Sequence, residues 1–315
     1  MATAKGYSTL AIDRPGIGGS SHGDPINLIQ AQIEVEALNG VTYLLRRGQI
    51  SGINNIFNKV IHVGHSFGSI QSYWLSALYP NNTDGLVLTG WSANGNSLPQ
   101  TIAGWDLHSA RLNQPYRFGN ASVGVLQKTI KDWLGGSSFF QAVQKFLPLE
   151  SPALWNEIAT TEVLDLINGY NQTGIRQYNY ASGYLTHSDL TANQYVFLRY
   201  GRYDIGLGVF SEKTKQPVTI GELLTLGSAP AKSYFSGPVL VYTGEYDQPF
   251  CGLNCYDTGG AAASIPAQSQ ALFPKARTFE AYIQPDTGHG INVHYNSTAG
   301  NKYVQDWLGA HGLAA

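Results

Sequence analysis

The stretch VIHVGHSFGS, residues 60–69, decides how the rest of the chain is interpreted. Its apolar first half predicts the end of a buried strand, and the run that follows, SIQSYWLSALYP, predicts a helix. Gly64 and Gly68 stand two residues before and two after Ser66, the pattern of a tight turn that strains the serine backbone. We expect only glycine to fit at both positions, and the turn to expose the Ser66 hydroxyl at a helix N-terminus, where negative charge is stabilised.

A serine hydroxyl is a weak nucleophile until a neighbouring base takes its proton, so Ser66 requires a histidine and an acid from elsewhere in the chain. Asp247 comes just after a predicted strand at 238–243, and His289 lies between two glycines after a predicted strand at 277–283. The order Ser, Asp, His along the chain is the one expected for this type of turn. We therefore predict a catalytic triad of Ser66, Asp247 and His289.

Other residues compete for two of these roles. Glu245 is a second carboxylate two positions before Asp247, but Asp247 fits better the position that follows a strand end. His62 lies within the predicted strand, where we expect it to pack. His65 is adjacent to the serine and is expected to point elsewhere, and His294 is expected at the entry to the last helix.

Strands and helices alternate in the two end portions of the chain. Strands are predicted at 7–12, 59–63, 85–90, 238–243 and 277–283, and helices at 28–47, 69–80 and 299–310. This alternation favours an α/β fold with a mostly parallel sheet that helices cover on both faces.

The alternation stops between residues 92 and 236. This segment favours helices, is interrupted by Gly and Pro, and contains many aromatic side chains: Trp105, Trp133, Phe139, Phe140, Trp155, Tyr178, Tyr180 and Tyr184. We interpret 92–236 as a helical cap inserted into a core formed by 1–91 and 237–315. Its aromatic residues can form a small core and also line a pocket.

The composition excludes several classes of function. The 315 residues are 43% hydrophobic and 13% charged, with a formal net charge of -2, so a large core is expected and no basic stripe for nucleic acid. The apolar runs are far shorter than the ~18 residues of a membrane helix, and MATAKGYSTL lacks the apolar region of a signal peptide. We expect no cofactor, no metal, no nucleic-acid partner and no membrane span.

The two cysteines, Cys251 and Cys255, lie close together in the chain. A zinc site would need further ligands nearby, and neither a histidine nor a third cysteine flanks the pair. A local disulfide is favoured over two reduced thiols, and it would indicate an oxidising compartment.

The segments AIDRPGIGGS, GHSFGS, GEYDQPF and TGHGI together resemble the α/β-hydrolase superfamily, over nearly the whole chain except the cap. The resemblance implies that Ser66 is the nucleophile, His289 the base and Asp247 the orienting acid. It also implies that the backbone N–H of Phe67 is one donor of the oxyanion hole. A serine at this turn argues against epoxide hydrolases and haloalkane dehalogenases. The paired cysteines and GHGINVHYN are similar to an extracellular fungal branch, which implies a secreted protein.

The beginning of the chain departs from this family pattern. Family members have several strands and a helix before the strand that matches 7–12, whereas here MATAKG resembles only the last turn of that helix, with Gly6 as its C-cap. Among the missing pieces is the strand that in the family's sheet lies between the strands matching 7–12 and 59–63, together with its following loop, which supplies the second oxyanion donor. We therefore expect a truncated chain with unpaired sheet edges, low solubility and little activity on its own.

These features predict a serine hydrolase that cleaves an ester-like or related acyl bond through an acyl-enzyme. The aromatic, weakly charged cap favours a small, apolar substrate. Two alternatives remain open: the same triad can serve an acyltransferase or a cofactor-free lyase or perhydrolase, and a truncated chain can keep the fold as a non-catalytic protein.

Overall fold

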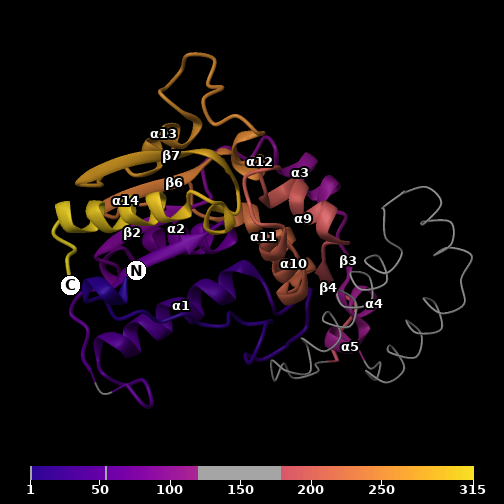
Figure 1. Cartoon of the computed structure of the whole chain (residues 1–315). Coiled ribbons are helices and arrows are strands. Elements are labelled where there is room, and N and C mark those ends of the chain that lie inside the picture. Colours follow the sequence, from indigo (N-terminus) through magenta and orange to yellow (C-terminus); the bar gives the residue numbers. More distant parts are fainter. Residues whose placement is uncertain (1, 54, 120–178) are drawn as a thin grey trace, which may run out of the picture.

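A parallel sheet forms the core of the computed structural model, which describes residues 2–53, 55–119 and 179–315 (Figure 1). Its strands are β1 (Ile61–His65), β2 (Gly85–Thr89), β6 (Pro238–Tyr246) and β7 (Thr278–Gly288). They pair in the order β1-β2-β6-β7, and every neighbouring pair is parallel. Four of the five predicted strands are thereby confirmed.

Helices cover both faces of this sheet. On one face Tyr73 of α2 (Phe67–Leu78) joins a cluster with the β2 side chains Leu86 and Leu88. On the other face Trp307 of α14 (Ser297–Ala310) packs with Val87, the β2 residue between them. Helix α1 (Ala31–Arg46) packs in turn against α2. Strand β2 is buried on both faces, as the continuous apolar run GLVLT predicts, and the predicted α/β architecture is confirmed.

Residues 7–12 are not a strand, and that prediction is wrong. Within the described part of the chain, the backbone of 8–12 makes no hydrogen bond and β1 pairs with β2 alone. Leu10 is 47% exposed and Val63 of β1 is 61% exposed. An apolar, extended sequence becomes a strand only when its backbone hydrogen-bonds to another strand, and in the described residues the segment 8–12 makes no such bond, although the outer edge of β1 is unpaired.

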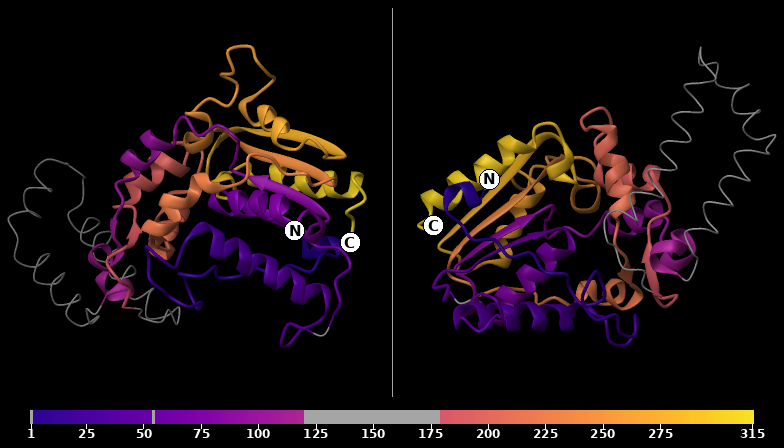
Figure 2. Two further views of the ribbon diagram at one scale, coloured as in Figure 1. Left: turned by 180° about the vertical axis from the view of Figure 1, so that it is seen from behind. Right: turned by 60° about the horizontal axis from the view of Figure 1, so that its bottom comes forward.

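The predicted cap segment contributes six described helices: α3 (Leu98–Trp105), α4 (Ala110–Asn113), α5 (Pro115–Phe118), α9 (Leu190–Phe197), α10 (Ile205–Thr214) and α11 (Ile220–Thr225). It also forms a small antiparallel sheet of β3 (His108–Ser109), β4 (Tyr184–Thr186) and β5 (Val218–Thr219), which the sequence did not predict because such short strands show no alternation. The predicted cap aromatics Trp133, Phe139, Phe140, Trp155 and Tyr178 lie outside the described residues. In Figure 2 the two chain ends lie together, away from α4 and α5.

Short helices complete the described fold: η1 (Thr3–Lys5), η2 (Pro80–Asn82), η3 (Leu226–Ser228), α12 (Gln248–Cys251), α13 (Ile265–Gln268), η4 (Ser269–Leu272) and η5 (Ile291–Val293). Gly6 ends η1 with a left-handed backbone at φ 90°, the conformation expected of a glycine C-cap.

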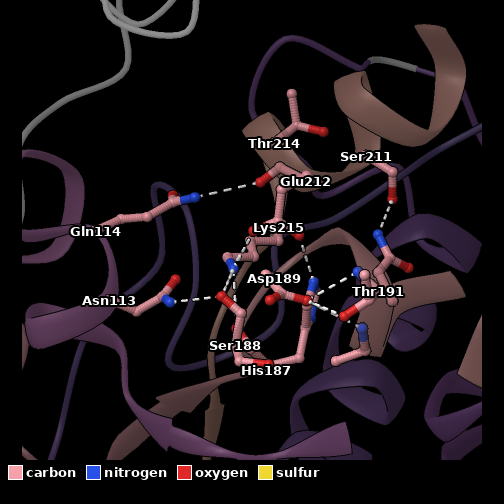
Figure 3. A network of polar contacts seen from close by, with 12 residues as sticks. Asn113, Gln114, His187, Ser188, Asp189, Thr191, Ser211, Glu212, Thr214 and Lys215 are labelled. Atoms are coloured by element: carbon pink, nitrogen blue, oxygen red, sulfur yellow. Dashed lines mark hydrogen bonds and ion pairs between the residues drawn. The ribbon is translucent and has the colours of Figure 1, made fainter. Parts of the chain in front are cut away.

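A buried polar network holds α10 against β4 and α9 (Figure 3). The ammonium group of Lys215 donates to the carbonyl oxygen of His187 at 2.9 Å and pairs with the carboxylate of Glu212. The second Glu212 oxygen is 2.8 Å from Nε2 of His187. His187 in turn stacks on Trp105, with ring centroids 6.1 Å apart. The network therefore fixes the position of Trp105, the last residue of α3.

Arg14, in the loop after residues 7–12, lies between two buried carboxylates. Its Nε is 2.8 Å from Oε1 of Glu222 in α11 and 3.2 Å from Oε1 of Glu34 in α1. Gln71 of α2 donates to the other Glu34 oxygen at 2.5 Å. Burial and the charge of Glu222 raise the pKa of Glu34 to about 9, because one guanidinium does not neutralise two carboxylates. Glu34 is thus protonated at neutral pH, and Arg14, in contact with Glu34 and Glu222, connects α1 to α11.

Replacing Glu34 with glutamine should flatten the dependence of stability on pH. The ordinary pKa of 4.5 applies in the unfolded chain, so unfolding releases a proton. The Glu34 contribution is therefore complete below pH 4.5 and is lost as the pH rises toward about 9, by up to about 1.4 kcal/mol per pH unit. Glu34→Gln keeps the hydrogen-bonding shape without the titration, so its free energy of unfolding should fall less across this window.

Urea unfolding followed by tryptophan fluorescence at several pH values measures this difference. Glu36→Gln is the matched control, because Glu36 lies on the same helix but is exposed. Parallel pH profiles for wild type and Glu34→Gln would show that Glu34 carries no such proton.

Candidate active site

The turn after β1 has the strained geometry that its sequence predicts. Ser66 has φ 54° and ψ -117°, a conformation that non-glycine residues rarely adopt. A methyl group on Gly64 would lie 2.3 Å from the carbonyl oxygen of Gly68, so only glycine fits there. At Gly68 an added methyl group would meet nothing within 4 Å, and the expectation that this position also excludes side chains is wrong. The steric requirement therefore rests on Gly64.

Asp247 lies directly after β6 and caps the N-terminus of α12. Its side chain is fully buried. One carboxylate oxygen accepts from the backbone N–H of Phe250 at 2.9 Å, and the other accepts from the hydroxyl of Thr243 at 2.5 Å and from His289. Burial acts to raise the pKa of Asp247, but His289 and these hydrogen bonds outweigh it and hold the pKa below its ordinary value. Asp247 is therefore a carboxylate at neutral pH.

His289 follows β7 and is 1% exposed. Its Nδ1 is 2.8 Å from Oδ2 of Asp247, and because the carboxylate can only accept, Nδ1 carries the proton. Nε2 is buried and has no hydrogen-bond partner among the described residues. The imidazole thus has a lone pair on Nε2, which suits a general base.

Two observations place Ser66 and His289 near the same strand end. The backbone N–H of Ser66 donates to the carbonyl oxygen of Thr89, the last residue of β2, at 2.9 Å. A methyl group on the next residue, Gly90, would lie 3.0 Å from Cε1 of His289 and 2.6 Å from Cε1 of His65. Within the described residues no hydrogen bond joins the Ser66 hydroxyl to His289. Such bonds are often long before substrate binds.

His65 does not point away from the site, and that expectation is wrong. Its ring centroid is 5.0 Å from that of His289. Nδ1 of His65 donates to the hydroxyl of Thr89 at 3.0 Å, since this hydroxyl gives its own proton to the carbonyl of Gly64. Burial, and repulsion between the two imidazoles whenever both are protonated, lower the pKa of His65 to about 3. A neutral imidazole therefore lies beside the candidate base.

Two phenylalanines also enclose the His289 ring. The ring centroids of Phe197, at the end of α9, and Phe250, in α12, are 5.2 Å and 5.7 Å from it. The ring of Trp105 packs against that of Phe197, with their centroids 5.6 Å apart. Neither phenylalanine was singled out from the sequence, because an aromatic residue far along the chain gives no local sign of its contacts.

The remaining candidates lie where other contacts hold them. His62 is buried and hydrogen-bonded to two threonine hydroxyls, which confirms that it packs within the sheet. The carboxylate of Glu245 accepts from the backbone N–H of Asp286 at 3.0 Å and does not bond to His289. His294 lies before α14, as expected, and is buried.

Cys251 and Cys255 form the expected disulfide. The cross-linked segment follows Asp247 directly, and the backbone N–H of Leu253 returns to the Asp247 carbonyl at 3.1 Å. The N–H of Cys255 bonds to the carbonyl of Glu245 at 3.0 Å. The disulfide therefore closes the turn that carries the acid.

Phe67 is the first residue of α2, where backbone N–H groups have no partner inside the helix. This N–H is available to a negatively charged oxygen at the helix N-terminus. The guanidinium of Arg14 lies 5.5 Å from the centroid of the Phe67 ring. The group formed by Arg14, Glu34 and Glu222 is thereby in contact with the turn that carries Ser66.

Neither a metal nor a membrane feature is found in the described parts of the chain. Over residues 2–53, 55–119 and 179–315, no three His, Cys, Asp or Glu side chains are grouped as metal ligands would be. In the same ranges no helix combines the length and the apolar character needed to cross a bilayer.

Solved structures share this arrangement of strands and helices. A methylesterase from Arabidopsis superposes with a TM-score of 0.52 at 11% identity, over 98% of this chain and 89% of that one. The chain has the α/β-hydrolase fold. Tomato methylketone synthase I, solved with 2-tridecanone, is another structure with the α/β-hydrolase fold, at a TM-score of 0.51 and 10% identity, over 98% and 90% of the two chains. No protein-family model and no curated protein sequence matches the chain.

Proposed function

We propose that this α/β-hydrolase-fold chain is a serine hydrolase that cleaves an ester-like or related acyl bond. The observation that carries the proposal is the 2.8 Å bond between Asp247 and Nδ1 of His289, which leaves Nε2 unpartnered among the described residues. Ser66 is strained in the turn between β1 and α2, and its backbone N–H bonds to Thr89, the residue before Gly90, which approaches His289. The fold alone does not choose a chemistry, so the proposal rests on these side chains.

The reaction proceeds in two balanced steps. In the first, Oγ of Ser66 attacks the carbonyl carbon while Nε2 of His289 takes the hydroxyl proton. The same proton passes to the leaving group, the bond to the leaving group breaks, and an acyl ester forms on Ser66. In the second, water gives a proton to His289 and attacks that ester; the bond from the acyl carbon to Oγ breaks, Oγ takes the proton from His289, and the free acid leaves. Asp247 stabilises the imidazolium in both steps.

The tetrahedral intermediate carries a negative oxygen that needs hydrogen-bond donors. The backbone N–H of Phe67 is the donor we assign, since it stands at the N-terminus of α2 beside Ser66. The side chains of Phe197, Phe250 and Trp105 near His289 make an apolar, uncharged acyl group the favoured substrate. We assign residues 92–236 as the cap, and its described part contributes Phe197 and Trp105 beside the site.

We also propose that the protein is secreted. Disulfides persist mainly in oxidising compartments, and Cys251 and Cys255 are joined.

A fluorophosphonate probe together with para-nitrophenyl esters tests the proposed function. We expect the probe to label one residue, mapped by mass spectrometry to Ser66, and short acyl esters to be turned over with release of the free acid. Transfer of the acyl group to an added alcohol in place of water would identify an acyltransferase. The absence of both labelling and turnover would identify a non-catalytic protein that keeps the fold.

A further inference from the structure

His294 lies five residues after His289, and the proposed chemistry does not use its side chain. It is 2% exposed. Between the two histidines the 3-10 helix η5 turns the chain back on itself. The ring of His294 therefore lies against the backbone that carries His289.

Three hydrogen bonds connect the His294 ring to its surroundings. Nδ1 is 2.9 Å from the carbonyl oxygen of Gly290, the residue after His289. Nε2 is 3.1 Å from the backbone nitrogen of Gly288, the residue before it. Nε2 is also 2.9 Å from the backbone nitrogen of Arg199. One imidazole thus binds the chain on both sides of the candidate base.

The partners determine which nitrogen of His294 carries the proton. A carbonyl oxygen only accepts and a backbone N–H only donates, so Nδ1 is protonated and Nε2 has the lone pair. Burial lowers the pKa of His294, although its bond to Gly290 acts in the opposite direction. The ring is therefore neutral, and the two N–H groups of Gly288 and Arg199 share one acceptor.

The same contacts connect the His289 loop to the end of α9. The backbone N–H of Gly290 donates to the carbonyl of Phe197 at 2.7 Å. The Phe197 ring lies against His289, and Arg199 bonds to His294. A methyl group on Gly288 would lie 2.8 Å from the Phe197 oxygen, so these backbones pack closely. The loop has little room for a second position.

We propose that His294 is a positioning residue for His289: its ring holds the backbone of residues 288–290 so that Nδ1 of His289 meets Asp247 and Nε2 stays available to Ser66. This inference rests on the proposed function. A displacement of about 1 Å in a catalytic group can cost roughly 10²-fold in rate, so loss of the His294 bonds should act on turnover.

Three substitutions separate the two sides of the ring. His294→Ala removes all three bonds. His294→Gln keeps an acceptor for the N–H groups of Gly288 and Arg199, whereas His294→Asn keeps a donor for Gly290. His62→Gln is the matched control, because His62 is also a buried, neutral histidine with two hydrogen bonds, but in the sheet.

We expect His294→Ala to lower kcat for para-nitrophenyl acetate by roughly 10- to 10²-fold with KM within about twofold of wild type. His294→Gln should recover most of this loss, because it satisfies the two buried N–H groups. His62→Gln should lower the melting temperature and leave kcat unchanged. Wild-type kcat in His294→Ala, or equal losses in the alanine and glutamine variants at equal melting temperature, would overturn the proposal.

A second measurement does not depend on activity. The Nδ1 proton of His289, bonded to a carboxylate, should give a downfield proton NMR signal in wild type and in His62→Gln. The signal should weaken or vanish in His294→Ala and persist in His294→Gln. An unchanged signal in His294→Ala would overturn the positioning role even if the proposed hydrolase activity were absent, and a failed Ser66 labelling experiment would overturn the hydrolase alone.

Discussion

Replacing Ser66 with alanine is expected to abolish fluorophosphonate labelling and to lower the turnover of para-nitrophenyl acetate by roughly 10⁴-fold or more. The serine supplies the attacking oxygen, and no other hydroxyl stands at the strained turn of this chain. His289→Ala should cause a loss of similar size, because the base and the nucleophile act as one unit. The double variant should be no slower than either single variant.

Ser72→Ala is the control for this experiment. Ser72 lies on α2, and among the residues that the structure describes its hydroxyl bonds only to the carbonyl of Gly68, at 2.8 Å. The Ser72→Ala variant should keep an activity close to that of the wild type. Labelling that persists in Ser66→Ala would show that another residue is the nucleophile and would contradict the proposed triad.

Asp247→Asn should lower kcat by roughly 10⁴-fold with little change in fold. The Asp247 oxygen that meets His289 also accepts from the hydroxyl of Thr243, so it must be an acceptor on both sides. An amide NH₂ turned toward His289 would stabilise the tautomer with the proton on Nε2, which cannot take a proton from Ser66. Rate measurements with para-nitrophenyl acetate and a thermal unfolding scan separate loss of chemistry from loss of fold.

The second carboxylate near the strand end provides the control for Asp247. Glu245 bonds to the backbone of Asp286 and not to His289, so Glu245→Gln should keep near wild-type turnover. A larger loss in Glu245→Gln than in Asp247→Asn would reverse the assignment of the acid.

Local sequence patterns predicted the parts of the site that depend on short-range geometry. The turn around Ser66 depends on residues 64–68, and Gly64 is required there because its backbone approaches that of Gly68. Asp247 and His289 could be predicted because each follows a strand of a parallel sheet, and the ends of such strands meet at one edge. The failure at 7–12 has the opposite cause: an extended segment becomes a strand only when its backbone pairs with another strand, and pairing is decided by how distant segments pack.

Other members of the site could not be predicted, because their roles depend on contacts between distant segments. Phe197 comes from the cap segment and Phe250 from α12, yet both enclose His289. Arg14, Glu34 and Glu222 come from three separate segments of the chain, and the pKa of Glu34 is raised only because folding buries its carboxyl beside a second carboxylate.

The local sequence thus determines the strained conformation of Ser66 between β1 and α2, because the backbones of Gly64 and Gly68, two residues to either side, approach so closely that Gly64 has no room for a side chain. Folding decides which histidine is paired with an acid and which one supports it. His289 meets a carboxylate 42 residues away, whereas His294 meets two backbone N–H groups and a carbonyl. The two side chains are chemically identical, and a donor or acceptor role is assigned to each nitrogen only by the partner that packing places beside it.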